Sequence, residues 1–310
     1  MRTRKRSFMF LLIVIAALCV SALPFVMTAP KTVSAAGTTY IQTISVDTTW
    51  SDGTELKDNT TYQIKSGVTV TISGKVRARN NVISGGTIEF SDSKSYIDIV
   101  EKCTFTVENA TIDGNNNGSY NYFIRGTTSR SEVTANFNNS TIMNCDKLID
   151  VFSGSTVNIN NSTIKDCSGN FYLIRATGSD SPTINVSSGN FIDNKVRLFY
   201  TSKGIINIDG GIFTNNSKGV IRTYNQSTVT INGGTFTNNS ATSGGVIVND
   251  NSIVTINGGT FTNNSANTNG GVIYNYTAGD KLNIYGGHFA DNTANGVLND
   301  VYNKEDSVIL

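Results

Sequence analysis

Short runs in which β-branched residues alternate with polar ones fill the chain after its first 36 residues. Thr228–Ile231 is typical, because valine and isoleucine alternate there with threonine. A period of two is the pattern of a β-strand with one buried face. Gly, Asn and Ser separate the runs, as they do in tight turns. No helical period follows the leader, so the pattern predicts an all-β chain.

A repeat organises these runs. Thr230–Ala241 recurs almost letter for letter as Thr255–Ala266, and more loosely as Asn207–Ser217. A unit this short cannot bury its own apolar side chains, so it must stack on copies of itself. Its large apolar residue forms a first column with steps of 22 to 30 residues: Ile88, Ile112, Ile142, Ile164, Phe191, Phe213, Phe236, Phe261 and Phe289.

Two further columns accompany the first. The second lies three residues further on and holds Ser91, Asn115, Cys145, Cys167, Asn194, Asn216, Asn239, Asn264 and Asn292. Asparagine tolerates left-handed backbone, and stacked amides hydrogen-bond to each other, so this column predicts an asparagine ladder at a corner. The third is apolar throughout: Ile97, Ile124, Ile149, Ile174, Phe199, Ile221, Ile247, Ile273 and Leu298. Three short strands per coil, stacked through about nine coils, make a parallel β-helix.

The Phe-x-x-Asn motif at Phe236–Asn239 and the Gly-Gly-Val-Ile motif at Gly244–Ile247 resemble the repeats of polymorphic outer-membrane protein adhesins. More broadly, the chain from about Gly67 onward is similar to right-handed, pectate-lyase-like β-helix repeat proteins. The resemblance implies right-handed coils. It is specific for fold and weak for function, because this architecture carries many activities.

The two ends differ from the repeats. Residues 1–36 have a basic start, an apolar run over Phe8–Val26 and a small-x-small cleavage site at Ser34–Ala36, which together predict a secretion signal. An uncleaved membrane anchor is the alternative, and Pro24 and the cleavage site disfavour it. Residues 37–66 lack the repeat, and we interpret them as an N-terminal cap on the repeats of 67–310.

No C-terminal cap is evident in the sequence. Asp306–Leu310 resembles the first strand of another coil, comparable to Ser227–Ile231. An uncovered strand edge invites association. We therefore expect either that the protein continues beyond Leu310, or that its last strand pairs with a partner or a second copy.

Composition narrows the partners. The leader carries five of the 24 basic residues and no acidic one, which leaves 19 basic and 23 acidic residues. This balance argues against nucleic acid, which requires a basic stripe. A surface rich in Asn, Thr, Ser and Gly suits water and sugars. A secreted or cell-surface location follows from the leader, with membrane attachment only through the leader or a missing anchor.

The sequence predicts no catalytic residue and no metal site. The motifs that mark pectate lyases and polygalacturonases are absent, and His288 is the only histidine. Glycoside hydrolysis requires two carboxylates across a cleft. The aspartates near turns of neighbouring coils are better interpreted as turn formers: Asp113, Asp146, Asp150, Asp166, Asp193 and Asp209.

Two local features leave alternatives open. The run Asp113–Gly118 starts like a calcium loop, but apolar Ile124 occupies the position of the bidentate glutamate. A weak calcium site therefore remains an alternative to a plain Asn/Gly turn, and no other cofactor is expected. Cys145 and Cys167 share a column in successive coils, where a spacing of ~5 Å allows either a disulfide or two buried, stacked thiols.

A surface column follows the third apolar column by one residue. Strand alternation turns it outward: Asp98, Arg125, Asp150, Arg175, Tyr200, Arg222, Val248, Tyr274 and Asn299. Aromatic rings stack on sugars, and arginine binds carboxylate or sulfate bidentately. We therefore predict a ligand-binding stripe, with an ordinary solvated face as the alternative. Its members are Arg175, Tyr200, Arg222, Tyr224, Tyr274 and Tyr276.

These features together predict a non-catalytic, secreted or cell-surface repeat protein. It would act as an adhesin, a structural stalk or a glycan-binding module, with a polysaccharide or host-surface glycan as its partner. The alternative is a polysaccharide lyase or glycoside hydrolase whose site the motifs do not reveal.

Overall fold

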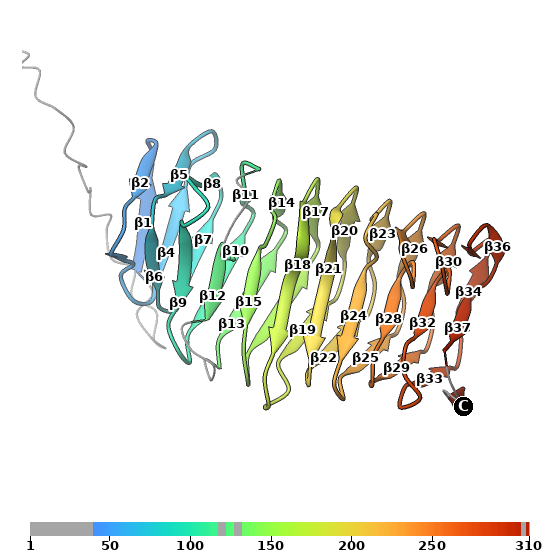
Figure 1. The fold of residues 1–310 in the computed structure, drawn as a ribbon. Coiled ribbons are helices and arrows are strands. Elements are labelled where there is room, and N and C mark those ends of the chain that lie inside the picture. Colours follow the sequence, from blue (N-terminus) through green and yellow to red (C-terminus); the bar gives the residue numbers. More distant parts are fainter. Residues whose placement is uncertain (1–39, 117–121, 127–131, 305–307, 310) are drawn as a thin grey trace, which may run out of the picture.

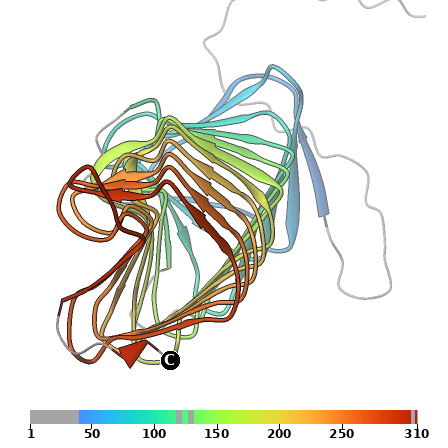
Figure 2. The same cartoon turned by 90° about the vertical axis from the view of Figure 1, so that its right-hand side faces the viewer.

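The protein is described by a computed structural model covering residues 40–116, 122–126, 132–304 and 308–309. These residues form an all-β, right-handed parallel β-helix and contain no helix. Successive coils lie side by side along a rod (Figure 1), and the view along its axis shows them superposed (Figure 2). The predicted fold class is confirmed. The leader, residues 1–36, and Leu310 lie outside the described residues.

Each coil contributes one strand to each of three long sheets, which we call A, B and C and which have 12, 11 and 11 strands. Sheet A consists of β1 (Tyr40–Ile44), β4 (Thr60–Ile64), β7 (Asn81–Ser84), β10 (Thr104–Glu108), β13 (Thr134–Asn138), β16 (Thr156–Asn160), β19 (Thr183–Val186), β22 (Ile205–Ile208), β25 (Thr228–Ile231), β29 (Ile253–Ile256), β33 (Lys281–Ile284) and β38 (Val308–Ile309). Sheet B consists of β2 (Thr48–Trp50), β5 (Thr69–Ile72), β8 (Thr87–Phe90), β11 (Thr111–Asp113), β14 (Thr141–Met143), β17 (Ser162–Lys165), β20 (Gly189–Ile192), β23 (Ile212–Thr214), β26 (Thr235–Thr237), β30 (Thr260–Thr262) and β34 (His288–Ala290).

Sheet C consists of β3 (Thr54–Glu55), β6 (Lys75–Ala78), β9 (Tyr96–Ile99), β12 (Ile124–Gly126), β15 (Ile149–Val151), β18 (Ser168–Thr177), β21 (Lys195–Ser202), β24 (Ile221–Tyr224), β28 (Ile247–Asn249), β32 (Ile273–Asn275) and β37 (Val301–Asn303). A small fourth sheet, D, joins β27 (Ser240–Ala241), β31 (Ser265–Ala266), β35 (Thr293–Ala294) and β36 (Val297–Leu298).

Coils also form at both ends of the repeat region. Two coils, β1–β3 and β4–β6, precede the one that contains Ile88, and their strands pair in parallel with their successors. The segment interpreted as a cap, 37–66, therefore contains the first coil and β4 of the second. At the other end β38 pairs with β33, which places Val308 and Ile309 in sheet A. The likeness of Asp306–Leu310 to the strand at Ser227–Ile231 predicts this position.

The first apolar column fills the core as predicted. Its nine members pair in register through sheet B, and those from Ile88 to Phe261 are buried. From Phe191 to Phe289 the rings stack face to face, with centroid separations of 4.4, 4.6, 4.8 and 4.7 Å. Burial of each side chain contributes about 1.5–3 kcal/mol, and each ring pair adds about 0.5–1.5 kcal/mol.

The asparagine ladder is also confirmed, and each ladder residue shares its corner with the Asn or Asp that precedes it. The second residue is buried, and its amide donates to the next ladder oxygen over 2.9, 2.8, 3.0 and 2.9 Å from Asn194 to Asn292. The first residue has the left-handed backbone, as at Asn238 with φ 55°. Ser91 and Asn115 are exposed and lie outside the ladder.

The prediction is wrong for one member of the third apolar column, Leu298. Ile273 pairs with Val301, whereas Leu298 is 73% exposed. Leu298 lies in β36, which folds back antiparallel on β35 around Asn295 and Gly296, both with positive φ. Asn-Gly is a strong hairpin signal, and this hairpin displaces the strand by three residues. Consequently Tyr302, not Asn299, continues the outward column after Tyr274.

Cys145 and Cys167 are free thiols buried in the position that asparagine takes in later coils. Their sulfurs donate to the carbonyls of Met143 and Lys165. Burial, together with the neighbouring thiol of Cys167, raises the pKa of Cys145 well above its usual range.

We expect an alkylating reagent to spare both thiols in the native protein and to modify both after unfolding without reductant, because only the unfolded chain exposes them. Mass spectrometry of the two samples measures this. A denatured, unreduced sample in which Cys145 and Cys167 stay unmodified would instead indicate a disulfide.

Candidate functional site

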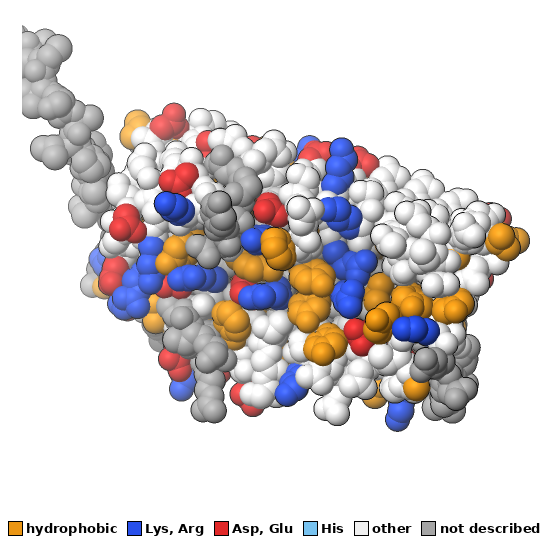
Figure 3. Space-filling model, viewed as in Figure 1, with side chains coloured by type: hydrophobic (Ala, Val, Ile, Leu, Met, Phe, Trp, Pro, Cys, Tyr) orange, Lys and Arg blue, Asp and Glu red, His pale blue; other side chains and the backbone are white. Residues whose placement is uncertain are grey.

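The six residues of the predicted stripe all lie along sheet C. Arg175, Tyr200 and Arg222 are register partners on β18, β21 and β24, and Tyr224 lies at the end of β24. Val248 then interrupts the column before Tyr274. Figure 3 shows basic and apolar side chains gathered in a band along this face. The stripe thus consists of one group around Tyr200 and another around Tyr274.

The aromatic members differ in exposure. Tyr224 and Tyr276 are 47% and 41% exposed, whereas Tyr274 is only 8% exposed and therefore buried. Tyr274 packs edge-on against Tyr276 with ring centroids 5.7 Å apart, and it also contacts Tyr302. The amine of Lys304 lies 4.3 Å above the Tyr276 ring. In this group Tyr274 supports the ring of Tyr276, which faces solvent.

The arginines at the N-terminal end of the column are paired with carboxylates. The register order is Glu55, Arg77, Asp98, Arg125, Asp150 and Arg175, so acid and base alternate from coil to coil. Nε and one terminal nitrogen of Arg175 both donate to the Asp150 carboxylate. Burial raises the pKa of Asp150, and the hydrogen bonds and charge of Arg175 offset part of that shift. Arg175 is therefore already engaged as a bidentate donor within the fold.

Sequence reasoning missed Tyr172, Phe171 and Arg197. The ring of Tyr172 stacks on that of Tyr200 with centroids 4.3 Å apart, and Tyr172 pairs in register with Arg197. Phe171 is 58% exposed, and the amine of Lys147 lies 4.3 Å from its ring centroid. All three precede the third apolar column, whereas the stripe was sought only after it. The signal was the run of aromatic residues directly before Leu173.

A pocket of about 270 Å³ opens beside Phe171. Its lining is polar apart from that ring: Asn116, Asn144, Asp146, Ser168, Gly169, Asn170 and Phe171. The ladder position is held here by cysteines, and β18 carries a register shift between Ser168 and Tyr172. Phe171 is exposed within this shifted segment and directly precedes Tyr172, so the pocket adjoins the stripe.

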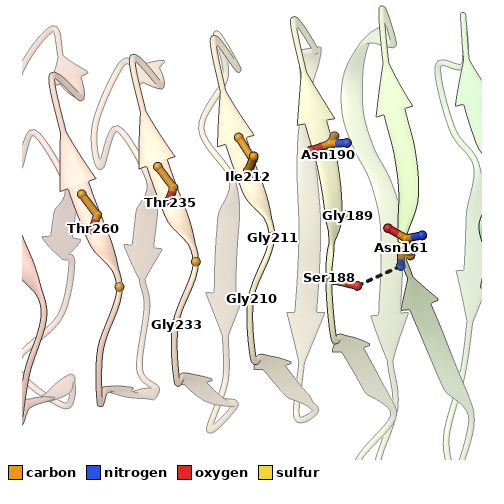
Figure 4. A pocket seen from close by; sticks show the side chains of 12 residues that line it. Asn161, Ser188, Gly189, Asn190, Gly210, Gly211, Ile212, Gly233, Thr235 and Thr260 are labelled. Carbon is orange, nitrogen blue, oxygen red and sulfur yellow. Dashed lines mark hydrogen bonds between the residues drawn. The ribbon is translucent and has the colours of Figure 1, made fainter.

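A second, open groove of about 570 Å³ follows the Gly-Gly corners that precede sheet B (Figure 4). Asn190, Ile212, Thr235 and Thr260 project from equivalent positions of four coils. The glycines serve the backbone, since Gly234 has φ 104° and a Cβ on Gly233 would approach the Asp209 carbonyl oxygen to 2.9 Å. No charged side chain lines this groove.

The predicted turn-forming aspartates have structural roles. Asp166 and Asp193 have left-handed backbone, and Asp113 accepts hydrogen bonds from the Asn115 amide and the Asn144 side chain. The calcium-like run continues into residues 117 and 118, which lie outside the described residues. In the described part of the chain no three His, Cys, Asp or Glu side chains gather as metal ligands. His288 is exposed on sheet B, away from the stripe.

A scan against protein-family models, a search of curated proteins and a search of solved structures each returned no match. The repeat architecture and the surface of sheet C are therefore the basis for any functional conclusion. Within the described ranges, no helix has the length and apolarity needed to cross a membrane.

Proposed function

We propose that this chain is a secreted or cell-surface, non-catalytic β-helix that binds a polysaccharide or cell-surface glycan along sheet C. One observation supports the proposal most: the stacked rings of Tyr172 and Tyr200, with Tyr224 exposed in the next coil, form an aromatic row on a hydrophilic rod. The N-terminal leader of the sequence supports export.

The geometry suits an extended chain of sugars. Coils of a β-helix repeat at ~4.8 Å, which is close to the length of one sugar unit. Aromatic side chains offer an apolar face with little rotamer entropy to lose, and the hydroxyl of tyrosine remains available to water or ligand. The polar pocket beside Phe171 adds amide and hydroxyl groups at one end of the row. A glycan bound this way would lie along the rod axis.

The test is retention of the purified chain on immobilised polysaccharides, with the released products measured in parallel. Replacing Tyr172 and Tyr200 together by alanine should weaken binding about tenfold or more, because anchoring rings each contribute upwards of about 1 kcal/mol. Tyr285→Ala is the matched control, since that ring is 74% exposed between β33 and β34 and lies off sheet C.

Two outcomes would contradict the proposal. Equal retention of the double variant and the wild-type chain would remove the aromatic row as the binding surface. New reducing ends or unsaturated uronides in the released material would make the protein a polysaccharide-degrading enzyme.

A further inference from the structure

The acid–base alternation on sheet C stops at β21. Asp98 and Asp150 occupy alternate coils, and the next acidic position in that series is taken by Tyr200. Arg222 follows in the next coil, so its register partner on one side is a tyrosine and on the other Val248. At this point neither register partner of Arg222 in the column is a carboxylate.

Arg197 and Arg222 lie on the neighbouring strands β21 and β24 at this break, and the backbone of Lys218 contacts Arg197. Nε of Arg197 donates to the carbonyl oxygen of Lys218 over 2.8 Å. The amine of Lys218 donates to the Gly169 carbonyl and the Asn170 side-chain oxygen over 2.7 and 3.1 Å. Among the described residues, no carboxylate lies within ion-pair distance of Arg197 or Lys218. Arg222 has one at 3.4 Å, in Asp250.

The other arginines of this face are placed differently. Arg77 contacts Glu55 at 3.2 Å, Arg125 contacts Asp98 at 3.6 Å, and Arg175 is bidentate on Asp150. Their charges, like that of Arg222 beside Asp250, are balanced inside the protein. Arg197 and Lys218 donate hydrogen bonds to neutral oxygens, and among the described residues no carboxylate balances their charges, so both remain available to an external anion.

The electrostatics agree with this geometry. Burial and the charge of Arg222 lower the pKa of Arg197 to about 10. The positive charges of Arg197 and Arg222 repel each other in this partly buried position, and an anion bound between them would relieve that repulsion. Charge-assisted bonds from guanidinium to an oxyanion are also among the strongest hydrogen bonds in proteins.

We infer that Arg197 and Lys218, with Arg222 beside Arg197, form a subsite for an anionic group on a sugar, either a sulfate ester or a uronate carboxylate. The inference rests on the proposed function, and it makes the glycan an acidic one. Tyr172 pairs in register with Arg197, and Tyr200 with Arg222, so the two stacked rings would hold the sugar while the cations hold its charged substituent. Arg175 does not take part, because Asp150 occupies it.

The first experiment compares three forms of one polymer: dextran, dextran sulfate and carboxymethyl dextran. We expect the wild-type chain to bind at least one charged form more tightly than dextran at moderate salt. Replacing Arg197 and Lys218 together by glutamine should reduce that affinity about tenfold or more, and should reduce binding to neutral dextran far less. The preferred charged form distinguishes sulfate from carboxylate. Arg77→Gln is the control, since Arg77 lies on the same face but is paired with Glu55.

Equal affinity of the double variant and the wild-type chain for both charged polymers would overturn the inference. So would wild-type binding that does not distinguish charged from neutral dextran.

A second measurement does not depend on a glycan. Sodium sulfate and sodium chloride are compared at equal ionic strength by thermal unfolding. Sulfate stabilises proteins in general, so the Arg77→Gln chain sets the baseline. A subsite predicts that sulfate raises the melting temperature of the wild-type and Arg77→Gln chains more than that of the double variant. An equal rise in all three would refute the subsite. If no polysaccharide binds but sulfate still raises the melting temperature of the wild-type chain more than that of the double variant, the glycan function alone would be refuted.

Discussion

Replacing Asn239 with leucine is expected to destabilise the protein by at least ~3 kcal/mol, although the two side chains have the same number and branching of heavy atoms. The side-chain oxygen of Asn239 accepts hydrogen bonds from the backbone and side-chain amides of Asn216. Its own amide donates to the Phe213 carbonyl and to the side-chain oxygen of Asn264. Leucine removes these four buried hydrogen bonds, and each polar group left unsatisfied in the core costs about 1–3 kcal/mol.

The matched control is Asn232→Leu. Asn232 also stacks with residues of the neighbouring coils, donating to Asp209 and accepting from Asn257, but it is exposed. Water replaces the lost partners there, so we expect a loss below about 1 kcal/mol. Urea unfolding measures both variants, and hydrogen exchange shows whether protection is lost in the coils around Phe213 and Phe261. Similar losses in the two variants would mean that burial does not determine the strength of the ladder.

The ladder also shows how much of the fold can be predicted from the sequence alone. Repetition of Asn at a fixed distance from Phe identifies the corner, because few residues other than Asn satisfy a turn and stack on copies of themselves. The ladder residues were named correctly, but the left-handed backbone was assigned to them, whereas the residue before each of them adopts it, as at Asn238. Leu298 was misplaced because the column was counted by spacing, and the Asn295–Gly296 hairpin that changes the spacing was not counted.

The candidate site was predicted less well than the core. Outward direction follows from strand alternation, so Arg175, Tyr200 and Arg222 were correctly brought together. The charges around these residues depend on which side chain each coil places beside them. They also depend on a register shift in β18, which the repeat spacing in the sequence does not predict. Arg175 was predicted as a ligand group, and the structure engages it with Asp150. Arg197, which has no carboxylate partner among the described residues, could be identified as a site residue only from the structure.

Ile221→Asp should abolish cooperative folding at neutral pH. Ile221 is buried between its register partners Phe199 and Ile247, in a core cluster of apolar side chains. An ionised carboxylate without a partner in such surroundings costs several kcal/mol or more. Tyr224→Asp, at the exposed end of the same strand, is the control and should leave the protein soluble and folded. Circular dichroism and urea unfolding of the two variants make the comparison.

The pH dependence distinguishes a buried charge from a mere loss of packing. Burial raises the pKa of an aspartate in the folded state above its unfolded value of about 4. The folded state then binds the proton more tightly, so the charge penalty is absent below about pH 4 and grows as pH rises towards the folded pKa. The stability difference between Ile221→Asp and the wild-type chain should therefore shrink on acidification, whereas the difference for a packing variant such as Ile221→Ala stays constant. A soluble, cooperatively folded Ile221→Asp chain at neutral pH would show that this column does not face the core, and with it the outward assignment of Arg222 would fail.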